Sequence, residues 1–137
     1  MKTRILLLSV FLFAAIGVYA QKNSTELVGT WKLLSAQYDG EESILSKDLV
    51  YMKFYTKSHF CSVLYMKEGL VKQAIGGTYT FSKGDCTENV TFVDDQRARI
   101  LNTKSTFKIT VKKDKMEING FYGDGTQTLR EVWEKVE

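Results

Sequence analysis

Apolar and polar side chains alternate in short runs along most of the chain, and this pattern predicts strands rather than helices. In the clearest run, residues 105–112, Phe107, Ile109 and Val111 alternate with polar side chains. A period of two is typical of a strand with one buried face. Helical periodicity is weak, and we expect a short helix or an irregular connection only from Asp94 to Leu101.

Turn residues divide the chain into about nine predicted strands. The runs between the turns are rich in Val, Ile, Thr, Tyr, Phe and Trp, which strands favour. One hairpin is predicted around Gly84 and another around Asp114, and Gly76-Gly77 is predicted as a further turn. The predicted strands are Gly29–Tyr38, Leu49–Thr56, His59–Lys67, Leu70–Ile75, 78–82, 89–92, 105–112, 116–119 and Gln127–Val136.

The number of consecutive strands and their short connections predict an all-β fold, an up-and-down antiparallel β-barrel of about eight to ten strands. An open sheet of this kind would expose two edges, and closing it removes both. The sequence contains no proline, which agrees with a closed sheet because proline cannot donate to the hydrogen-bond ladder. A two-sheet sandwich is the competing architecture, but its longer crossing connections are not visible in the sequence.

The N-terminal residues have the three parts of a secretory signal peptide. Lys2 and Arg4 provide a positive start, an uncharged and mostly apolar stretch follows, and small residues end with Ala20, after which cleavage is predicted. The uncharged stretch, residues 5–18, is shorter than the roughly 20 residues of a transmembrane helix, so we expect no stable membrane insertion. The chain is thus predicted to consist of a signal peptide, residues 1–20, and one periplasmic or secreted domain, residues 21–137.

The predicted mature domain is nearly neutral. Of the 19 Lys and Arg residues, Lys2 and Arg4 leave with the signal, so 17 basic residues face 16 acidic ones. The basic cluster at 112–115 is interrupted by Asp114 and coincides with a predicted hairpin tip. We therefore expect no nucleic-acid partner. We also expect no cofactor, and a monomer or weak dimer.

Short motifs at the two ends of the predicted domain resemble those of a known superfamily. The first strand begins Gly29-Thr30-Trp31-Lys32-Leu33, and the last contains Glu131-Val132-Trp133-Glu134-Lys135. The chain resembles the lipocalin superfamily, whose first strand starts with Gly-x-Trp. It is more closely similar to small exported lipocalin-like bacterial domains of unknown function that begin Gly-Thr-Trp-Lys-Leu. The resemblance implies that Trp31 packs at the closed end of the barrel beneath a basic residue from the last strand, for which Arg130 is the candidate. Structural roles are expected for Gly29, Trp31, Arg130 and Trp133.

Two carboxylates fall on strand faces that are predicted to point inward. Glu88 shares a face with Val90, and Glu131 shares one with Leu129. Each needs a partner because an unpaired charge is costly to bury. The candidate partners are Arg97, Arg99, Arg130, Tyr65 or a bound ligand. The predicted inward set is Trp31, Leu33, Met52, Phe54, Tyr79, Phe81, Val90, Phe92, Phe107, Ile109, Met116, Ile118, Leu129 and Trp133.

A barrel of this size is either filled by its own side chains or holds one small ligand. Our leading hypothesis is a noncatalytic binding protein for a small hydrophobic or amphipathic molecule. A carboxylate at the barrel mouth would orient the polar head of that molecule. The predicted ligand-binding residues are Phe54, Tyr65, Tyr79, Glu88, Phe107 and Glu131.

Two other functions are compatible with the same pattern. A filled barrel would act as an interaction or structural module outside the cytoplasm, with Tyr51, Tyr55 and Phe121 as candidates for an exposed apolar patch. A hydrolase or isomerase would use one of the two carboxylates as a base together with His59. The sequence has no serine elbow, phosphate loop or metal-ligand spacing, so we expect neither an enzyme nor a metal site.

The two cysteines, Cys61 and Cys86, allow one disulfide in an exported chain. Such a bridge would stabilise the fold by about 3 kcal/mol. Two buried free thiols are the alternative, because the sequence does not give the distance between the two Cα atoms.

Overall fold

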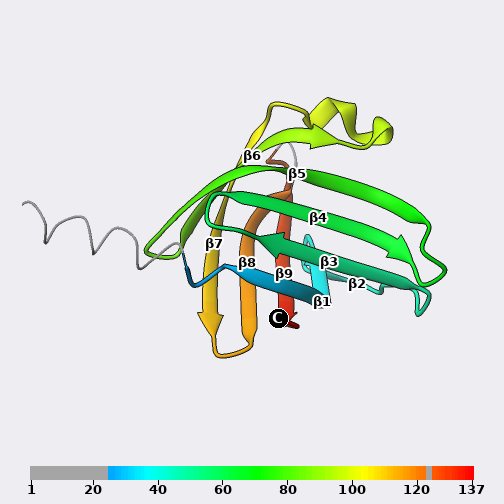
Figure 1. Ribbon diagram of the computed structural model, residues 1–137, viewed down its shortest axis with the longest axis horizontal. Coiled ribbons are helices and arrows are strands. Elements are labelled where there is room, and N and C mark those ends of the chain that lie inside the picture. Colours follow the sequence, from blue (N-terminus) through cyan, green and yellow to red (C-terminus); the bar gives the residue numbers. More distant parts are fainter. Residues whose placement is uncertain (1–24, 123–124) are drawn as a thin grey trace, which may run out of the picture.

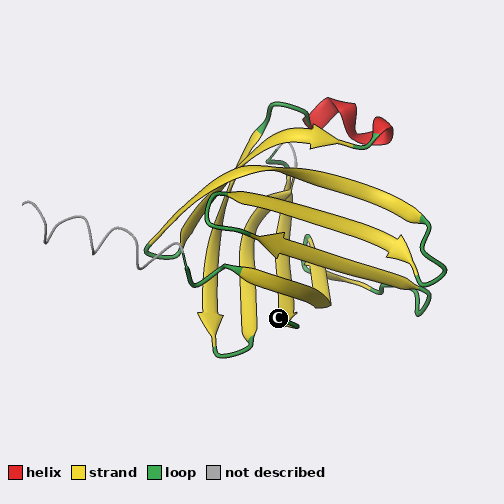
Figure 2. Ribbon diagram, viewed as in Figure 1, coloured by secondary structure: helices red, strands yellow, loops and turns green. Residues whose placement is uncertain are grey.

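The computed structural model describes residues 25–122 and 125–137, and strands make up most of this part of the chain (Figure 2). The predicted signal peptide, residues 1–20, lies outside the described residues. In chain order the elements are β1 (Gly29–Tyr38), β2 (Glu41–Ser43), β3 (Leu49–Tyr55), β4 (His59–Met66), β5 (Val71–Ser82), β6 (Asp85–Val93), the 3-10 helix η1 (Asp95–Ile100), β7 (Lys104–Lys112), β8 (Lys115–Tyr122) and β9 (Gln127–Lys135).

The strands close into a barrel (Figure 1). β1 pairs with β3, each strand from β3 to β9 pairs antiparallel with the next, and β9 pairs back with β1. The short β2 extends the sheet beside the end of β1, so eight strands form the closed wall. The predicted all-β, up-and-down antiparallel barrel is confirmed, and the sandwich alternative is wrong.

Both predicted hairpins are present. β5 and β6 are joined by Lys83 and Gly84, which have positive φ angles of 51° and 87°. Two consecutive positive φ values give a turn whose twist matches that of the paired strands, and glycine adopts such values without strain. Lys113 and Asp114 join β7 to β8 in the lower hairpin of Figure 1.

The predicted turn at Gly76-Gly77 is wrong, because both residues lie inside the continuous strand β5. A Cβ atom at Gly76 would overlap the ring of Phe92, and one at Gly77 would overlap the carbonyl oxygen of Asn89. The pairing between β5 and β6 also shifts register at this point. The two glycines therefore allow a close approach of neighbouring strands at a β-bulge and do not reverse the chain.

The predicted inward face of β3 is also wrong. Met52 and Phe54 were expected inside, yet Phe54 is 39% exposed, whereas Lys53 and Tyr55 are only 6% and 3% exposed. Almost every residue of β3 is apolar, so alternation gave a weak signal and the lysine was assigned to solvent. The structure instead places the lysine inside the barrel.

Phe92 was likewise expected inside and is 47% exposed. Gly76 pairs with Phe92 and Gly77 pairs with Val90, so Thr91 is an extra residue on β6. This bulge interrupts the period of two after Val90, and Phe92 packs on the outer side of Gly76. Apart from Met52, Phe54 and Phe92, the predicted inward residues are buried or pack against the buried core.

Trp31 closes one end of the barrel, as the resemblance implied. Its side chain is fully buried, and its indole Nε1 donates to the carbonyl oxygen of Leu27 at 2.8 Å. The basic residue over its ring is Lys135, whose Nζ lies 5.4 Å from the ring centroid. Arg130 was the wrong candidate, because it lies on the outer surface and its Nε donates to Glu117 Oε1 at 3.1 Å.

Candidate functional site

A cavity of about 70 Å³ lies inside the barrel, away from the end that Trp31 closes. For scale, an engineered apolar cavity of about 150 Å³ holds one benzene molecule. The cavity is partly open, and its lining combines aromatic and aliphatic side chains with three charged ones, Lys53, Glu88 and Glu131. As it stands, it has room for a few heavy atoms.

Lys53 and Glu88 form a buried ion pair on the cavity wall. Lys53 Nζ lies 2.7 Å from Glu88 Oε1. Tyr55 donates its hydroxyl to the same carboxylate oxygen at 2.6 Å. Lys53 and Tyr55 are two residues apart on β3 and so point to the same side, while Glu88 reaches them from β6.

Glu131 is the second buried carboxylate of the cavity, and it comes from β9. Trp133 Nε1 donates to Glu131 Oε2 at 3.0 Å, and the Tyr38 hydroxyl donates to Glu131 Oε1 at 3.4 Å. Glu131 and Trp133 are two residues apart on the same strand, so the strand period brings them to one face. Among the described residues, no Lys or Arg nitrogen forms an ion pair with Glu131.

The electrostatics of the cavity favour positive charge. Burial raises the pKa of Glu131 and the neighbouring Glu88 raises it further, against the opposing effect of Lys53. Burial by itself lowers the pKa of Lys53, but the two carboxylates outweigh this effect and the net pKa is raised. Burial and the charge of Glu88 also raise the pKa of Tyr55 well above its ordinary value. All three groups therefore hold their protons more firmly than they would in water.

Aromatic rings surround these charges. The ammonium of Lys53 lies 5.3 Å from the ring centroid of Tyr55, 5.5 Å from that of Phe60 and 5.8 Å from that of Phe107. Near Glu131, the rings of Tyr51 and Trp133 pack with their centroids 5.2 Å apart. Aromatic faces attract cations, and the attraction strengthens when water is excluded.

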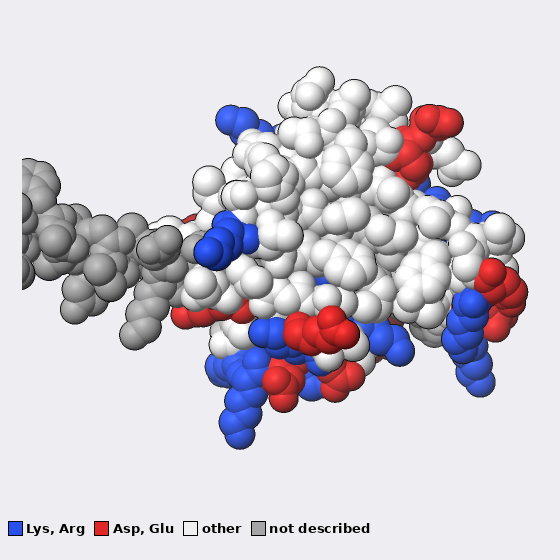
Figure 3. All heavy atoms as spheres, viewed as in Figure 1, with Lys and Arg blue, Asp and Glu red and all other residues white. Residues whose placement is uncertain are grey.

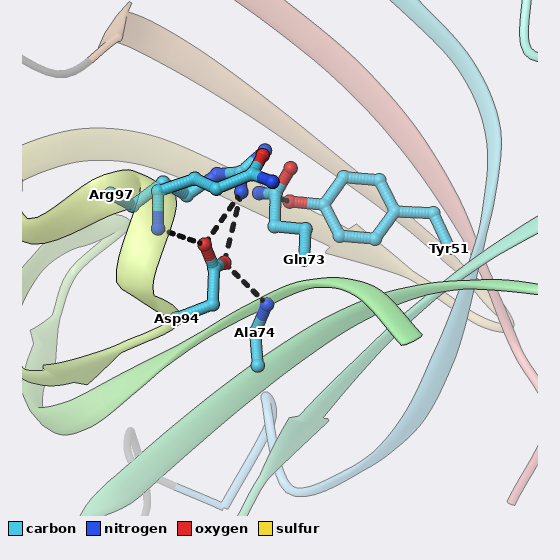
Figure 4. A network of polar contacts seen from close by, with 6 residues as sticks. Tyr51, Gln73, Ala74, Asp94 and Arg97 are labelled. Carbon is cyan, nitrogen blue, oxygen red and sulfur yellow. Dashed lines mark hydrogen bonds and ion pairs between the residues drawn. The ribbon is translucent and has the colours of Figure 1, made fainter. Parts of the chain in front are cut away.

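The short helix η1 lies at the mouth of the cavity, which Ile100 and Thr103 help to line. Asp94 caps η1 and ties it to β5 (Figure 4). Its Oδ2 accepts from the backbone N–H of Ala74 at 2.9 Å, and Arg97 Nη1 donates to both of its carboxylate oxygens. The backbone and Arg97 bonds outweigh desolvation and lower the pKa of Asp94.

The structure brings together three of the six predicted ligand-binding residues. Glu88, Phe107 and Glu131 line the cavity. Tyr79 is buried nearer the closed end, where its hydroxyl donates to the carbonyl oxygen of Thr56 at 2.6 Å. Phe54 and Tyr65 lie on the outer face, since Tyr65 pairs with Val50, which alternates with the inward Tyr51. Ligand binding by Glu88, Phe107 and Glu131 stays a prediction.

Sequence reasoning missed Lys53 and Tyr51 as cavity residues. The partners proposed for the buried carboxylates were Arg97, Arg99, Arg130 or Tyr65, yet the cation that pairs with Glu88 is Lys53. Two features of the sequence could have identified Lys53. The two inward carboxylates need a cation, and Lys53 lies in the middle of an apolar strand.

The outer wall carries the exposed apolar side chains. Of the three candidates for such a patch, Tyr51 lines the cavity and Tyr55 is buried, and only Phe121 is exposed, at 54%. On the face in Figure 3, which is formed by β3, β4 and β5, uncharged atoms cover the centre, while charged groups gather along the lower edge and the rim. Exposed apolar residues of the outer wall include Phe54, Val71 and Phe92.

A larger hollow of about 480 Å³ lies on the outer surface beside Phe121 and Arg130. The charged residues that line it, Lys108 and Arg130, are exposed. Because it lacks the buried charges of the cavity, this hollow is a weaker candidate for a specific site.

Both cysteines are free thiols, so the possible disulfide is not formed. Cys86 points into the core and is fully buried. Cys61 pairs with the exposed Phe54 and follows the inward Phe60, so it faces outward. The two thiols therefore lie on opposite sides of the barrel wall.

The described residues contain neither a metal-ligand cluster nor a helix that could span a membrane. No three His, Cys, Asp or Glu side chains of residues 25–122 and 125–137 come close enough to hold a metal ion. Within the same ranges, no helix has the length and apolar character needed to cross a membrane. His59, the base partner of the enzyme alternative, is exposed, and its Nδ1 lies 2.9 Å from Ser58 Oγ.

Residues 26–137 match the model of a protein family described as "Domain of unknown function (DUF4488)". The chain belongs to this family. No curated protein matches this DUF4488 domain. Among solved structures, a lipocalin-like protein from Bacteroides uniformis has a TM-score of 0.59 at 18% identity, over 80% of this chain and 98% of that protein. An uncharacterized protein from Bacteroides eggerthii has a TM-score of 0.57 at 19% identity, again over 80% and 98%. The expected lipocalin-like fold is thereby confirmed.

Proposed function

We propose that this DUF4488 domain is a noncatalytic binding protein that holds one small amphipathic molecule inside its barrel. The observation that carries the proposal is the partly open cavity in which two buried carboxylates and one lysine lie among aromatic rings. A mostly apolar pocket with a few convergent polar groups is the usual form of a small-molecule site.

The size of the cavity limits the ligand. A volume of about 70 Å³ accommodates a polar head and only the first atoms of an apolar body. A longer apolar tail would leave past Ile100 and Thr103, beside η1. The proposal therefore favours short amphipathic molecules, or longer ones of which only the head is enclosed.

The arrangement of the carboxylates supports a binding role over a catalytic one. Glu88 is held by Lys53 and Tyr55, and Glu131 by Trp133 and Tyr38. A general base must be within hydrogen-bond reach of the proton that it removes. The exposed His59 does not line the cavity, so it is not positioned to assist either carboxylate.

We further propose that the domain works in the periplasm or outside the cell. The support is the charged start, the uncharged stretch and the small residues that end at Ala20. Intact-mass measurement of the protein from its own host tests this, because export predicts a chain that begins at Gln21.

The two tryptophans provide a direct test of ligand binding. Trp133 donates to Glu131 in the cavity, whereas Trp31 donates to Leu27 at the closed end. In a two-dimensional ¹⁵N–¹H spectrum, a ligand in the cavity should shift the indole signal of Trp133 and leave that of Trp31 nearly unchanged. A Trp133→Phe variant assigns the two signals.

Native mass spectrometry of protein from its own host would identify a retained molecule. If short amphipathic compounds of every head group leave the Trp133 signal unchanged and no molecule is retained, the binding function is wrong. The alternative of an interaction module would then be the better hypothesis.

A further inference from the structure

We propose that the ligand of the barrel carries a cationic amine head, which binds to Glu131 beside the paired rings of Tyr51 and Trp133. This inference rests on the proposed small-molecule function and adds the chemical class of the ligand.

The charges inside the barrel favour a cationic ligand. The charged side chains that line the cavity are two carboxylates and one lysine. Lys53 is used by Glu88 at 2.7 Å, and Glu131 has hydrogen-bond donors but forms no ion pair with a Lys or Arg among the described residues. One buried carboxylate thus has no cation of its own, and a buried charge is costly without one.

The cavity already holds one ammonium group, that of Lys53, against a carboxylate and aromatic rings. The Lys53 ammonium lies against a carboxylate and beside the rings of Phe60 and Phe107. Glu131 likewise lies beside aromatic rings, since Trp133 donates its N–H to it and Tyr51 packs on Trp133. A cation at Glu131 would meet the face of one of these rings, because the N–H edge of the indole is electropositive. Aromatic rings beside a carboxylate bind cations by quadrupole attraction and direct charge pairing.

The same charges disfavour a ligand with an acidic head. A carboxylate head would enter a cavity whose own charges are two negative and one positive. Lys53 could pair with it only by giving up part of its contact with Glu88, which would leave a second buried carboxylate without its cation. The cavity therefore disfavours acids of the same size and shape.

The test compares n-butylamine, n-butanol and butyrate by titration of the Trp133 indole signal. These probes share one apolar chain and differ in the charge of the head. We expect n-butylamine to bind about tenfold more tightly than n-butanol, which is the factor for a desolvated cation contact of moderate strength. Butyrate should bind more weakly than both.

Glu131→Gln keeps a hydrogen-bond acceptor for Trp133 and removes the charge. The amine and the alcohol should therefore bind this variant about equally tightly. Glu117→Gln is the matched control, because this exposed carboxylate on β8 pairs with Arg130 outside the barrel. This control should keep the full preference. If Glu131→Gln does not fold, Tyr51→Leu removes the half-buried ring of the pair and should weaken amine binding more than alcohol binding.

Each outcome decides between the two proposals. If the alcohol or butyrate binds as well as the amine, or if Glu131→Gln retains the preference, the amine class is wrong while small-molecule binding stands. If none of the three probes shifts Trp133, both the amine class and the proposed function are overturned for short amphipathic ligands.

Discussion

Lys53 and Glu88 meet across the inside of the barrel with Nζ and Oε1 2.7 Å apart, although their strands, β3 and β6, are not neighbours in the wall. β4 and β5 lie between these strands. The ion pair therefore connects two parts of the wall that share no backbone hydrogen bonds. It also excludes a completely apolar interior, which gives the cavity its chemical character.

We predict that Lys53→Met destabilises the protein by about 3–5 kcal/mol, because it leaves Glu88 buried without its cation. Glu88→Gln should also destabilise the fold, since Lys53 then loses its partner. The double variant should be less destabilised than the sum of the two single variants, and urea denaturation measures all three. Additive effects would mean that the pair is not coupled in the folded protein.

The pH dependence of stability should identify Glu131 as a buried group. Burial first, and then Glu88, raise its pKa above the ordinary value of 4.5, while Lys53, Trp133 and Tyr38 oppose the rise. Between 4.5 and the raised value the folded state binds more protons than the unfolded state, so the contribution of Glu131 to the free energy of unfolding falls as pH rises. The difference in the free energy of unfolding, wild type minus Glu131→Gln, should therefore fall as pH rises above 4.5.

Glu117→Gln provides the opposite sign in the same experiment. Hydrogen bonds from Arg130 and Asn119 lower the pKa of Glu117 below 4.5, so its stabilising contribution is present above that pH and is lost as the pH falls further. Urea denaturation at a series of pH values checks both slopes. A wild-type advantage over Glu131→Gln that grows with pH would show that Glu131 is favourably ionised in the fold.

The sequence was sufficient for those parts of the fold that depend on local chemistry. Alternation in β7 and the turn residues Lys83-Gly84 and Lys113-Asp114 act between near neighbours, and both hairpins follow from them. A series of such hairpins can bury one face and remove its edges only by closing. The barrel class was therefore predictable.

The cavity was only partly predictable, because its contents depend on contacts between distant strands. β3 is apolar on both faces, so alternation could not decide that Tyr51 and Lys53 point inward. The pairing of Lys53 with Glu88 depends on the closed barrel, which places non-neighbouring strands opposite one another. Glu88 and Glu131 were predictable because each shares its face with apolar residues on its own strand.

Asp94→Ala should loosen the mouth of the cavity. Asp94 caps η1 and accepts from the backbone N–H of Ala74, and loss of such a cap costs about 1 kcal/mol. We expect faster hydrogen exchange of the Ala74 amide and across residues 96–103, measured by mass spectrometry. Asp95→Ala is the control because Asp95 is exposed and is not the capping residue. Equal exchange in both variants would mean that the cap does not hold η1 in place.

Lys135→Ala should destabilise the closed end by about 0.5–1 kcal/mol, because the Lys135 ammonium lies 5.4 Å from the ring centroid of Trp31. Arg130→Ala should have a smaller effect, since Arg130 is on the outer surface and pairs with the partly exposed Glu117. Thermal unfolding monitored by tryptophan fluorescence compares the two. A larger loss in Arg130→Ala would restore Arg130 as the important basic residue of the last strand.

The two thiols should differ in reactivity because they lie on opposite sides of the barrel wall. Burial, and after it the charge of Glu88, raise the pKa of Cys86 to about 12. Burial also raises the pKa of Cys61, but this thiol is only partly buried, on the outer face. The reactive form is the thiolate. At mildly alkaline pH, a thiol-reactive dye should therefore label Cys61 in the folded protein and both cysteines after unfolding in urea. In Cys61→Ser, the folded protein should no longer be labelled, whereas the unfolded protein should still be labelled at Cys86.

Two outcomes would contradict this prediction. If neither cysteine is labelled in urea without reductant, the two form a disulfide. If Cys86 is labelled rapidly in the folded protein, solvent reaches the interior beside Glu88.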